Sequence, residues 1–146
     1  MIQTGEFTME FEIATKDMAS AGSISTSIKK MLRDLGLPGE MVRRASIACY
    51  EAEMNAVIHA TTCKVSLKVD MSMVLMCFDD RGPGIRDIDK AMQEGFSTAP
   101  GEVREMGFGA GMGLPNIKRN SDWMELTSRV GEGTRLCFAI YFNERA

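Results

Sequence analysis

Hydrophobic residues recur along this chain with two different periods, and the order of those periods limits the folds that the chain can adopt. In residues 6–13 every second residue is apolar, which is the period of a strand with one solvent-exposed face. Over residues 17–35 the apolar steps lengthen to three and four, as in an amphipathic helix, and "GLPGE" then ends the run. We therefore predict a strand at a sheet edge, followed by a single helix.

The later elements follow from the same two periods. In chain order, we predict a helix at 40–60, strands at 63–69 and 73–79 joined as a hairpin by "DMS", a short helix at 88–94, a helix at 114–121, and strands at 123–129 and 134–142. The strand at 73–79 is apolar almost throughout, which is typical of a central strand. Because strands and helices mix without strict β-α-β alternation, the predicted fold class is α+β, a two-layer α/β sandwich with helices on one face of one sheet.

Length and charge narrow the range of functions. The chain has 146 residues, 45% of them hydrophobic, which predicts one domain, 1–146, with a single core. Its 17 basic and 20 acidic residues give a net charge of -3, without the clustered positive charge that nucleic acid or an anionic membrane requires. No apolar run approaches the roughly 18 residues that span a bilayer. We therefore expect a soluble protein that binds neither nucleic acid nor a membrane.

The cysteines indicate a reducing compartment. Cys49, Cys63, Cys77 and Cys137 lie far apart without a CxxC pair, and the lone His59 cannot complete a zinc site by itself. We expect four reduced thiols in the cytoplasm and no metal bound through sulfur. We interpret His59 as a packed or helix-terminating residue.

Glycine fills every second position of "GFGAGMG", residues 107–113, directly before the helix predicted at 114–121. Glycine-rich turns before a helix commonly bind phosphate, because unpaired N–H groups of the first helical turn point at the anion. The run has no lysine at Walker spacing and does not follow a strand as a dinucleotide motif does, and the chain lacks the HRD and DFG motifs of a protein-kinase domain. Upstream, residues 95–106 are predicted to form a mobile loop in which Arg104 is solvated.

Two polar sites upstream supply groups that a glycine loop lacks. In "DDRGPGI", residues 79–85, Asp80 precedes a glycine turn, where a carboxylate can accept a hydrogen bond from an exocyclic amine such as that of adenine. Glu51 and Asn55 lie four residues apart, on one face of the helix predicted at 40–60. An Asn oxygen suits Mg²⁺, and a neighbouring Glu can deprotonate an attacking hydroxyl. Taken singly, these residues are more often a partly exposed helix face and an ordinary turn.

Together, these motifs resemble the ATP-binding fold shared by gyrase, Hsp90, sensor histidine kinases and MutL. That superfamily has an ExxxN helix, a DxGxG turn and a GxGxGL loop in this order, and the chain matches them at 51–55, 80–84 and 109–114. A Gly-Thr pair at 133–134 enters the last strand, as the family usually has. The resemblance implies a mixed, mostly antiparallel sheet and a site for ATP and Mg²⁺.

Within the superfamily, the chain looks most like the bacterial serine/threonine kinases of sigma-factor partner-switching systems. By this resemblance Glu51 would be the general base, Asn55 the Mg²⁺ ligand and Asp80 the residue that recognises adenine. The residues expected to contact the nucleotide are Asn55, Asp80, Gly82, Gly84, Ile85, Gly109, Ala110, Gly111, Met112, Gly113, Leu114 and Thr134.

Two functions remain open at this stage. The first is a Mg-ATP-dependent kinase that phosphorylates a Ser or Thr of a small antagonist protein. The second is an ATP-gated binding module that sequesters a sigma factor or another regulator with little kinase activity. The resemblance implies these partners and is compatible with a homodimer. A detached catalytic half of a histidine kinase fits less well, because the helical dimerisation segment with its phospho-accepting histidine has no room in the chain.

Overall fold

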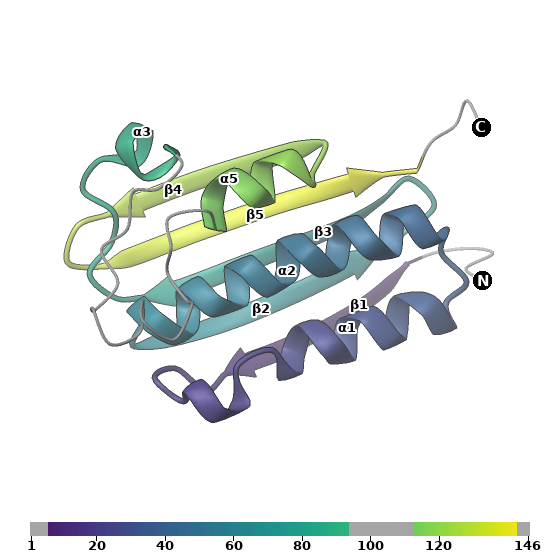
Figure 1. Ribbon diagram of the computed structural model, residues 1–146, viewed down its shortest axis with the longest axis horizontal. Helices are drawn as coiled ribbons and strands as arrows, with labels where there is room; N and C mark the ends of the chain where they lie inside the picture. Colours follow the sequence, from purple (N-terminus) through teal and green to yellow (C-terminus); the bar gives the residue numbers. More distant parts are fainter. Residues whose placement is uncertain (1–5, 94–112, 143–146) are drawn as a thin grey trace.

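Five strands pair into one sheet in the order β1-β2-β3-β5-β4, and all four pairings are antiparallel (Figure 1). The computed structural model describes residues 6–93 and 113–142. The strands are β1 (Phe7–Ile13), β2 (Thr62–Val69), β3 (Met73–Arg81), β4 (Trp123–Arg129) and β5 (Gly133–Tyr141). The helices are the 3₁₀ turn η1 (Met18–Ser20), α1 (Ser23–Asp34), α2 (Gly39–His59), α3 (Ile88–Ala91) and α5 (Gly113–Arg119).

Helices α1, α2 and α5 lie on the same face of the sheet, as Figure 1 shows. The strands turn alternate side chains toward these helices, so that one row of apolar residues crosses the whole sheet. That row consists of Phe11, Val65, Phe78, Leu136 and Leu126. The core therefore forms between the helical layer and one face of the sheet, which is the predicted α+β two-layer sandwich.

Two predictions about strand position are confirmed. Strand β1 pairs only with β2, at the edge of the sheet, and β3 pairs on both sides, with β2 and β5. The residues of β3 that face the helices, Val74, Met76 and Phe78, are buried in the core, whereas Met73 and Leu75 on the opposite face are only half-buried. Strand β3 also extends to Arg81, two residues beyond the predicted end, so Asp80 belongs to the strand.

The prediction of one helix over 17–35 is wrong. The chain forms η1, then passes through Gly22 with φ of 94°, and α1 begins at Ser23. The reason lies in α2, whose Glu53 is 1% exposed and accepts hydrogen bonds from the backbone N–H groups of Gly22, Ile24 and Ser25 at 3.0, 3.2 and 2.9 Å. A carboxylate suits these unpaired donors at the positive end of the helix dipole. Glu53 thus caps α1 from another helix and sets where it begins.

The expectation of four reduced thiols also differs from the structure. Cys77 of β3 and Cys137 of β5 are register partners and form a disulfide, whereas Cys49 and Cys63 are free and buried. The pairing depends on two strands that are 60 residues apart in sequence meeting in the sheet. Spacing of cysteines along the chain could not indicate it, and the argument from reduced thiols to a cytoplasmic location does not hold.

We expect Glu53→Ala to destabilise the protein by about 3 kcal/mol, because three N–H groups that are buried or part-buried lose a charged acceptor. Glu53→Gln should cost less, since its one carbonyl oxygen can still accept from part of the set. The measurement is the free energy of unfolding from urea denaturation. Glu40→Ala, which removes an exposed carboxylate from the first turn of the same helix, should change stability little. If Glu53→Ala were as stable as Glu40→Ala, the capping role of Glu53 would be refuted.

Candidate functional site

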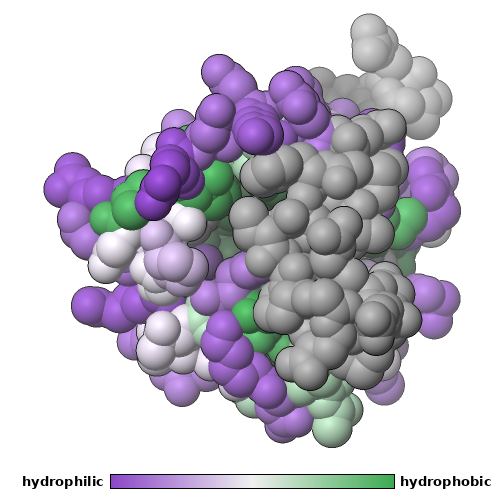
Figure 2. Space-filling model, turned by 60° about the vertical axis from the view of Figure 1, so that its left-hand side comes forward, coloured by the Kyte–Doolittle hydropathy of each residue, from purple (hydrophilic) through white to green (hydrophobic). Residues whose placement is uncertain are grey.

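Those predicted site residues that the structure describes lie at one end of the sandwich, where α2 and β3 end and α5 begins. This end is on the left in Figure 1 and comes forward in Figure 2. In Figure 2 the described surface on this face is predominantly hydrophilic, and hydrophobic atoms appear between the hydrophilic side chains in separate small areas.

Glu51 and Asn55 lie on the side of α2 that faces α5. Both are half-buried, whereas the three residues between them are buried. The Glu51 Oε2 atom accepts a hydrogen bond of 2.9 Å from Nδ2 of Asn116, a residue of α5. The two side chains that sequence patterning placed together are thus accessible on one helix face, and α5 packs beside them.

Gly113 brings the start of α5 very close to Asn55. A Cβ atom at Gly113 would lie 3.2 Å from both Nδ2 and Oδ1 of the Asn55 amide, closer than side chains normally pack. Glycine is needed here because backbone must approach a polar side chain that would otherwise be displaced. The end of the glycine run and the predicted Mg²⁺ ligand are therefore in contact, and Leu114 follows as a half-buried residue.

Asp80 sits on the helix-facing side of β3 and is half-buried. Its Oδ1 accepts a hydrogen bond of 3.0 Å from the backbone N–H of Thr134 in β5. Burial raises the pKa of Asp80, the hydrogen bond from Thr134 opposes this shift, and the neighbouring charge of Asp79 adds to it. Ionising Asp80 is therefore less favourable in the folded protein than in water. Carboxylates with such shifted pKa values are often found at binding and catalytic sites.

The turn after β3 is held by hydrogen bonds to the hairpin of β4 and β5. Gly84 has φ of 74°, and a Cβ there would overlap the backbone of Arg129. The Ile85 N–H donates to Oγ of Ser128 at 2.7 Å, and that hydroxyl lies 2.8 Å from Oγ1 of Thr134. Gly82 donates to the Glu132 carbonyl at 3.1 Å. The turn that carries three predicted nucleotide contacts is thus fixed beside Asp80.

The donor set fits the groups that the motifs predict. The Asn55 amide offers a hard oxygen of the kind that Mg²⁺ binds, and Asp80 offers a half-buried acceptor for an amine. A side chain at Gly113 would press against the Asn55 amide, so glycine at this position leaves that amide undisturbed. Among residues 6–93 and 113–142, no group of three or more His, Cys, Asp or Glu residues is placed to hold a metal ion.

Several predicted residues lie outside the part of the chain that the structure describes. These are Gly109, Ala110, Gly111 and Met112 of the glycine run, together with Arg104 and the loop predicted at 95–106. Their assignments stay predictions. His59 is described and half-buried, and burial, with the charge of Lys16, lowers its pKa. The imidazole is therefore held in its neutral form more firmly than usual.

Sequence reasoning missed Asn116 and Ser128. Both had a signal that was available: Asn116 is a polar residue inside an otherwise apolar helical turn, and Ser128 occupies a position where the alternation of β4 calls for an apolar residue. A polar side chain on a covered face needs a partner, and these two have partners at the site.

A hollow lies at the same end of the sheet, largely on the face away from the helices. Lys64, Asp79 and Arg135 are among the residues that line it. Two ion pairs lie within it, Arg135 with Asp79 at 3.4 Å and Arg129 with Glu132 at 3.7 Å. Neither Glu51 nor Asn55 lines this hollow, but Asp80, Ser128 and Thr134 do, so it borders the candidate site at Asp80.

No helix in the described ranges combines the length and the apolar character that crossing a membrane would take.

Comparison with known proteins identifies relatives of this chain. Residues 42–145 match the protein family described as histidine kinase-, DNA gyrase B-, and HSP90-like ATPase. The chain is 33% identical over 107 residues to an anti-sigma F factor of Caldanaerobacter subterraneus subsp. tengcongensis, a match that covers 70% of this chain and 71% of that protein. It is also 33% identical over 91 residues to the anti-sigma F factor of Pasteuria penetrans, covering 58% of this chain and 57% of the relative.

A further relative is the serine/threonine-protein kinase RsbT of Bacillus subtilis. It is 47% identical to this chain over 58 residues, which are 40% of this chain and 38% of the kinase. The matched stretch thus spans well under half of that protein, with higher identity than the matches to the two anti-sigma F factors.

We expect Asp80→Asn to separate stability from nucleotide binding. Because the pKa of Asp80 is raised in the fold, its ionised form destabilises the folded state above that pKa, and the cost disappears as the pH falls below it. The amide oxygen of Asn can still accept from Thr134. The variant should therefore be at least as stable as wild type near pH 7, and the two should converge near pH 4 in thermal unfolding.

The same variant should bind ATP about tenfold more weakly or worse, since a charge-assisted hydrogen bond contributes roughly 1.5 to 3 kcal/mol. Titration calorimetry measures the affinity. Asp79→Asn is the matched control, because Asp79 is exposed and pairs with Arg135. Unchanged ATP affinity of Asp80→Asn would exclude Asp80 from adenine recognition.

Proposed function

Because the chain belongs to the histidine kinase-, DNA gyrase B-, and HSP90-like ATPase family, we propose that it is a Mg-ATP-dependent serine/threonine protein kinase of a partner-switching system. Its substrate is a small regulatory antagonist protein. A family of ATPases implies ATP binding, and the relatives include both a serine/threonine kinase and anti-sigma factors. The proposed setting is the cytoplasm, where ATP and such regulators occur together.

One observation carries the proposal: a carboxylate and an amide oxygen one helical turn apart on α2 both contact the helix that follows the glycine run. Glu51 reaches Asn116, and Asn55 lies against Gly113. Phosphoryl transfer depends mainly on positioning and on stabilisation of charge, so a base and a metal ligand beside a phosphate-binding loop are the groups that it requires.

Each residue has a defined task in this proposal. Asp80 accepts a hydrogen bond from the adenine amine. Asn55 directs its amide oxygen toward Mg²⁺, and the N–H groups of the glycine run, residues 107–113, hold the phosphates. Glu51 takes the proton of the incoming Ser or Thr hydroxyl. ATP supplies the phosphoryl group, and Mg²⁺ neutralises the charge of the phosphates.

The remaining predicted contacts shape the pocket around these groups. The turn beside Asp80, the residue that recognises adenine, is formed by Gly82, Gly84 and Ile85. Thr134 fixes the Asp80 carboxylate through its backbone N–H. Leu114 supplies an apolar wall at the start of α5. Gly109, Ala110, Gly111 and Met112 complete the phosphate-binding loop.

A second candidate is an ATP-gated anti-sigma factor that sequesters a sigma factor or another regulator with little kinase activity. The coverage of the matches favours it: the Caldanaerobacter anti-sigma F factor aligns over 70% of this chain, whereas the kinase RsbT aligns over 40%. Both candidates use the same pocket. They differ in whether the phosphoryl group leaves ATP for the partner or the partner is only held.

We expect transfer of label from γ-labelled ATP to a small protein encoded beside this one, and a loss of about 100-fold or more with Glu51→Ala, because a general base contributes at least this much. ATP affinity should stay within about twofold of wild type, since Glu51 acts on the hydroxyl. Glu125→Ala, which removes an exposed carboxylate from β4, is the control.

The outcomes separate the two candidates. Label on the partner that depends on Glu51 supports the kinase. A stable complex with the partner, without transfer of label, supports sequestration instead. Full transfer by Glu51→Ala rules out Glu51 as the base.

We expect Asn55→Ala to abolish the gain in ATP affinity that Mg²⁺ provides, at least about tenfold, because the variant lacks the only amide oxygen assigned to the metal. The measurement is ATP affinity by calorimetry, with Mg²⁺ and with a chelator. Asn120→Ala, one residue beyond the end of α5, should keep the full Mg²⁺ effect. An equal Mg²⁺ effect in Asn55→Ala and wild type would contradict the assignment.

A further inference from the structure

We propose that Asn116 is a positioning residue for Glu51, which holds the carboxylate so that one defined oxygen faces the incoming hydroxyl. The inference rests on the proposed function, because Glu51 is the base only if the chain transfers a phosphoryl group. It adds a residue that none of the predicted motifs contains and that belongs to a different helix from the base.

The contact between the two side chains is direct. Nδ2 of Asn116 donates to Oε2 of Glu51 at 2.9 Å, across 65 residues of sequence. Both side chains are half-buried between α2 and α5, where a hydrogen bond to a charged group is stronger than on an open surface. Asn116 therefore restrains the torsions of a side chain that would otherwise sample several rotamers.

The partners of Asn116 determine which way its amide points. Nη2 of Arg119 donates to Oδ1 of Asn116 at 2.7 Å, while Nδ2 faces Glu51. A flipped amide would set its oxygen against a carboxylate and its NH₂ group against a guanidinium, losing both hydrogen bonds. The Asn116 amide thus has one orientation in which it keeps its hydrogen bonds to both Arg119 and Glu51.

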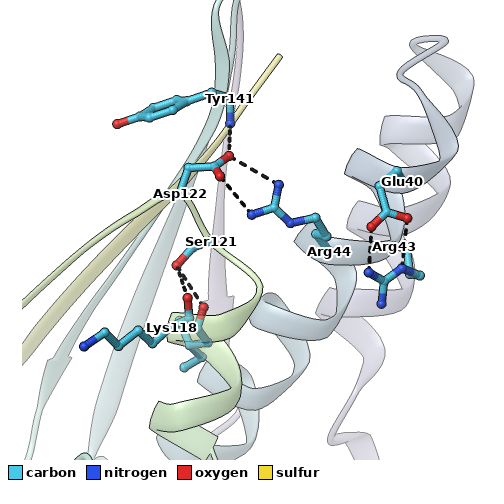
Figure 3. A network of polar contacts seen from close by, with 8 residues as sticks. Glu40, Arg43, Arg44, Lys118, Ser121, Asp122 and Tyr141 are labelled. Carbon is cyan, nitrogen blue, oxygen red and sulfur yellow. Dashed lines mark hydrogen bonds and ion pairs between the residues drawn. The ribbon is translucent and has the colours of Figure 1, made fainter. Parts of the chain in front are cut away.

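Helix α5, which carries Asn116, is anchored to α2 at both ends. At its start, Gly113 lies against Asn55. Beyond its end, Asp122 forms a bidentate pair with Arg44 of α2 at 3.0 and 3.3 Å and accepts from the backbone N–H of Tyr141 at 2.8 Å (Figure 3). The hydrogen bond from Arg44 lowers the pKa of Asp122, so this anchor is ionised at neutral pH.

Only one oxygen of Glu51 is occupied by this arrangement. Oε2 accepts from Asn116, and within residues 6–93 and 113–142 no other donor is hydrogen-bonded to the carboxylate. Oε1 is left to accept the proton of a hydroxyl. Since a small misplacement of a catalytic group can lower a rate about 100-fold, a residue that fixes this carboxylate acts on the rate of transfer and not on ATP affinity.

The test uses Asn116→Asp in the full chain. Asp has the shape of Asn and can still accept from Arg119, but it presents an oxygen to Glu51 in place of the donor. We expect kcat for phosphoryl transfer to fall about 10- to 100-fold, while KM for ATP and the midpoint of thermal unfolding change little. Asn120→Asp is the matched control, because it makes the same chemical change four residues later on a side chain that bonds the Asn116 carbonyl. This control should keep wild-type kcat.

A double variant distinguishes positioning from a general structural role. In a Glu51→Ala background, Asn116→Asp should produce no further loss of kcat, because the side chain that it positions is already gone. A further loss similar to that in the wild-type background would overturn the proposal. So would a single Asn116→Asp variant with wild-type kcat.

A measurement without nucleotide tests the contact itself. In the ¹H–¹⁵N spectrum of the free protein, the side-chain amide signals of Asn116 should move on Glu51→Ala, while those of Asn120 should stay. Unmoved Asn116 signals would refute the contact. A wild-type protein that transfers no label refutes the proposed function and leaves this contact measurable, whereas active wild type with an equally active Asn116→Asp refutes only the positioning role.

Discussion

The close packing of α2 on the sheet is the interaction on which the rest of the structure depends. Ala45, Ala48 and Ala52 on its buried face are at most 3% exposed, and their small side chains allow the helix to approach the strands closely. The same face contributes buried Ala56, which extends the contact along the core. Larger residues would raise α2 from the sheet and move every polar group that it carries away from its partner.

From this position α2 holds three other parts of the fold with polar side chains. Glu53 caps α1, Arg44 binds the connection between α5 and β4 through Asp122, and Glu51 and Asn55 meet α5. Each of these groups is wholly or partly removed from water, where a hydrogen bond depends on exact geometry and an unpaired partner is costly. A helix that is rigid against the core is therefore also the frame of the candidate site.

Much of the fold could be predicted, because its signals are local. The alternation at 6–13 and the apolar run at 73–79 indicated an edge and a central strand, and both positions are confirmed. The single helix over 17–35 was a wrong prediction, because the start of α1 is set by the carboxylate of Glu53, which is 31 residues from Gly22 in sequence. The disulfide between Cys77 and Cys137 was missed for the same kind of reason, since strand register decides it.

The sequence by itself determined which chemical groups are present and in what order: an acid and an amide one turn apart, a carboxylate before a glycine turn, and a glycine run before a helix. Hydrophobic period and residue spacing are local, so they are visible along the chain. Only the tertiary structure decided that Asn116 meets Glu51 and that the N–H of Thr134 meets Asp80, contacts that span 65 and 54 residues. Such contacts depend on how α2, α5 and the sheet pack together, and packing is set by the whole core at once.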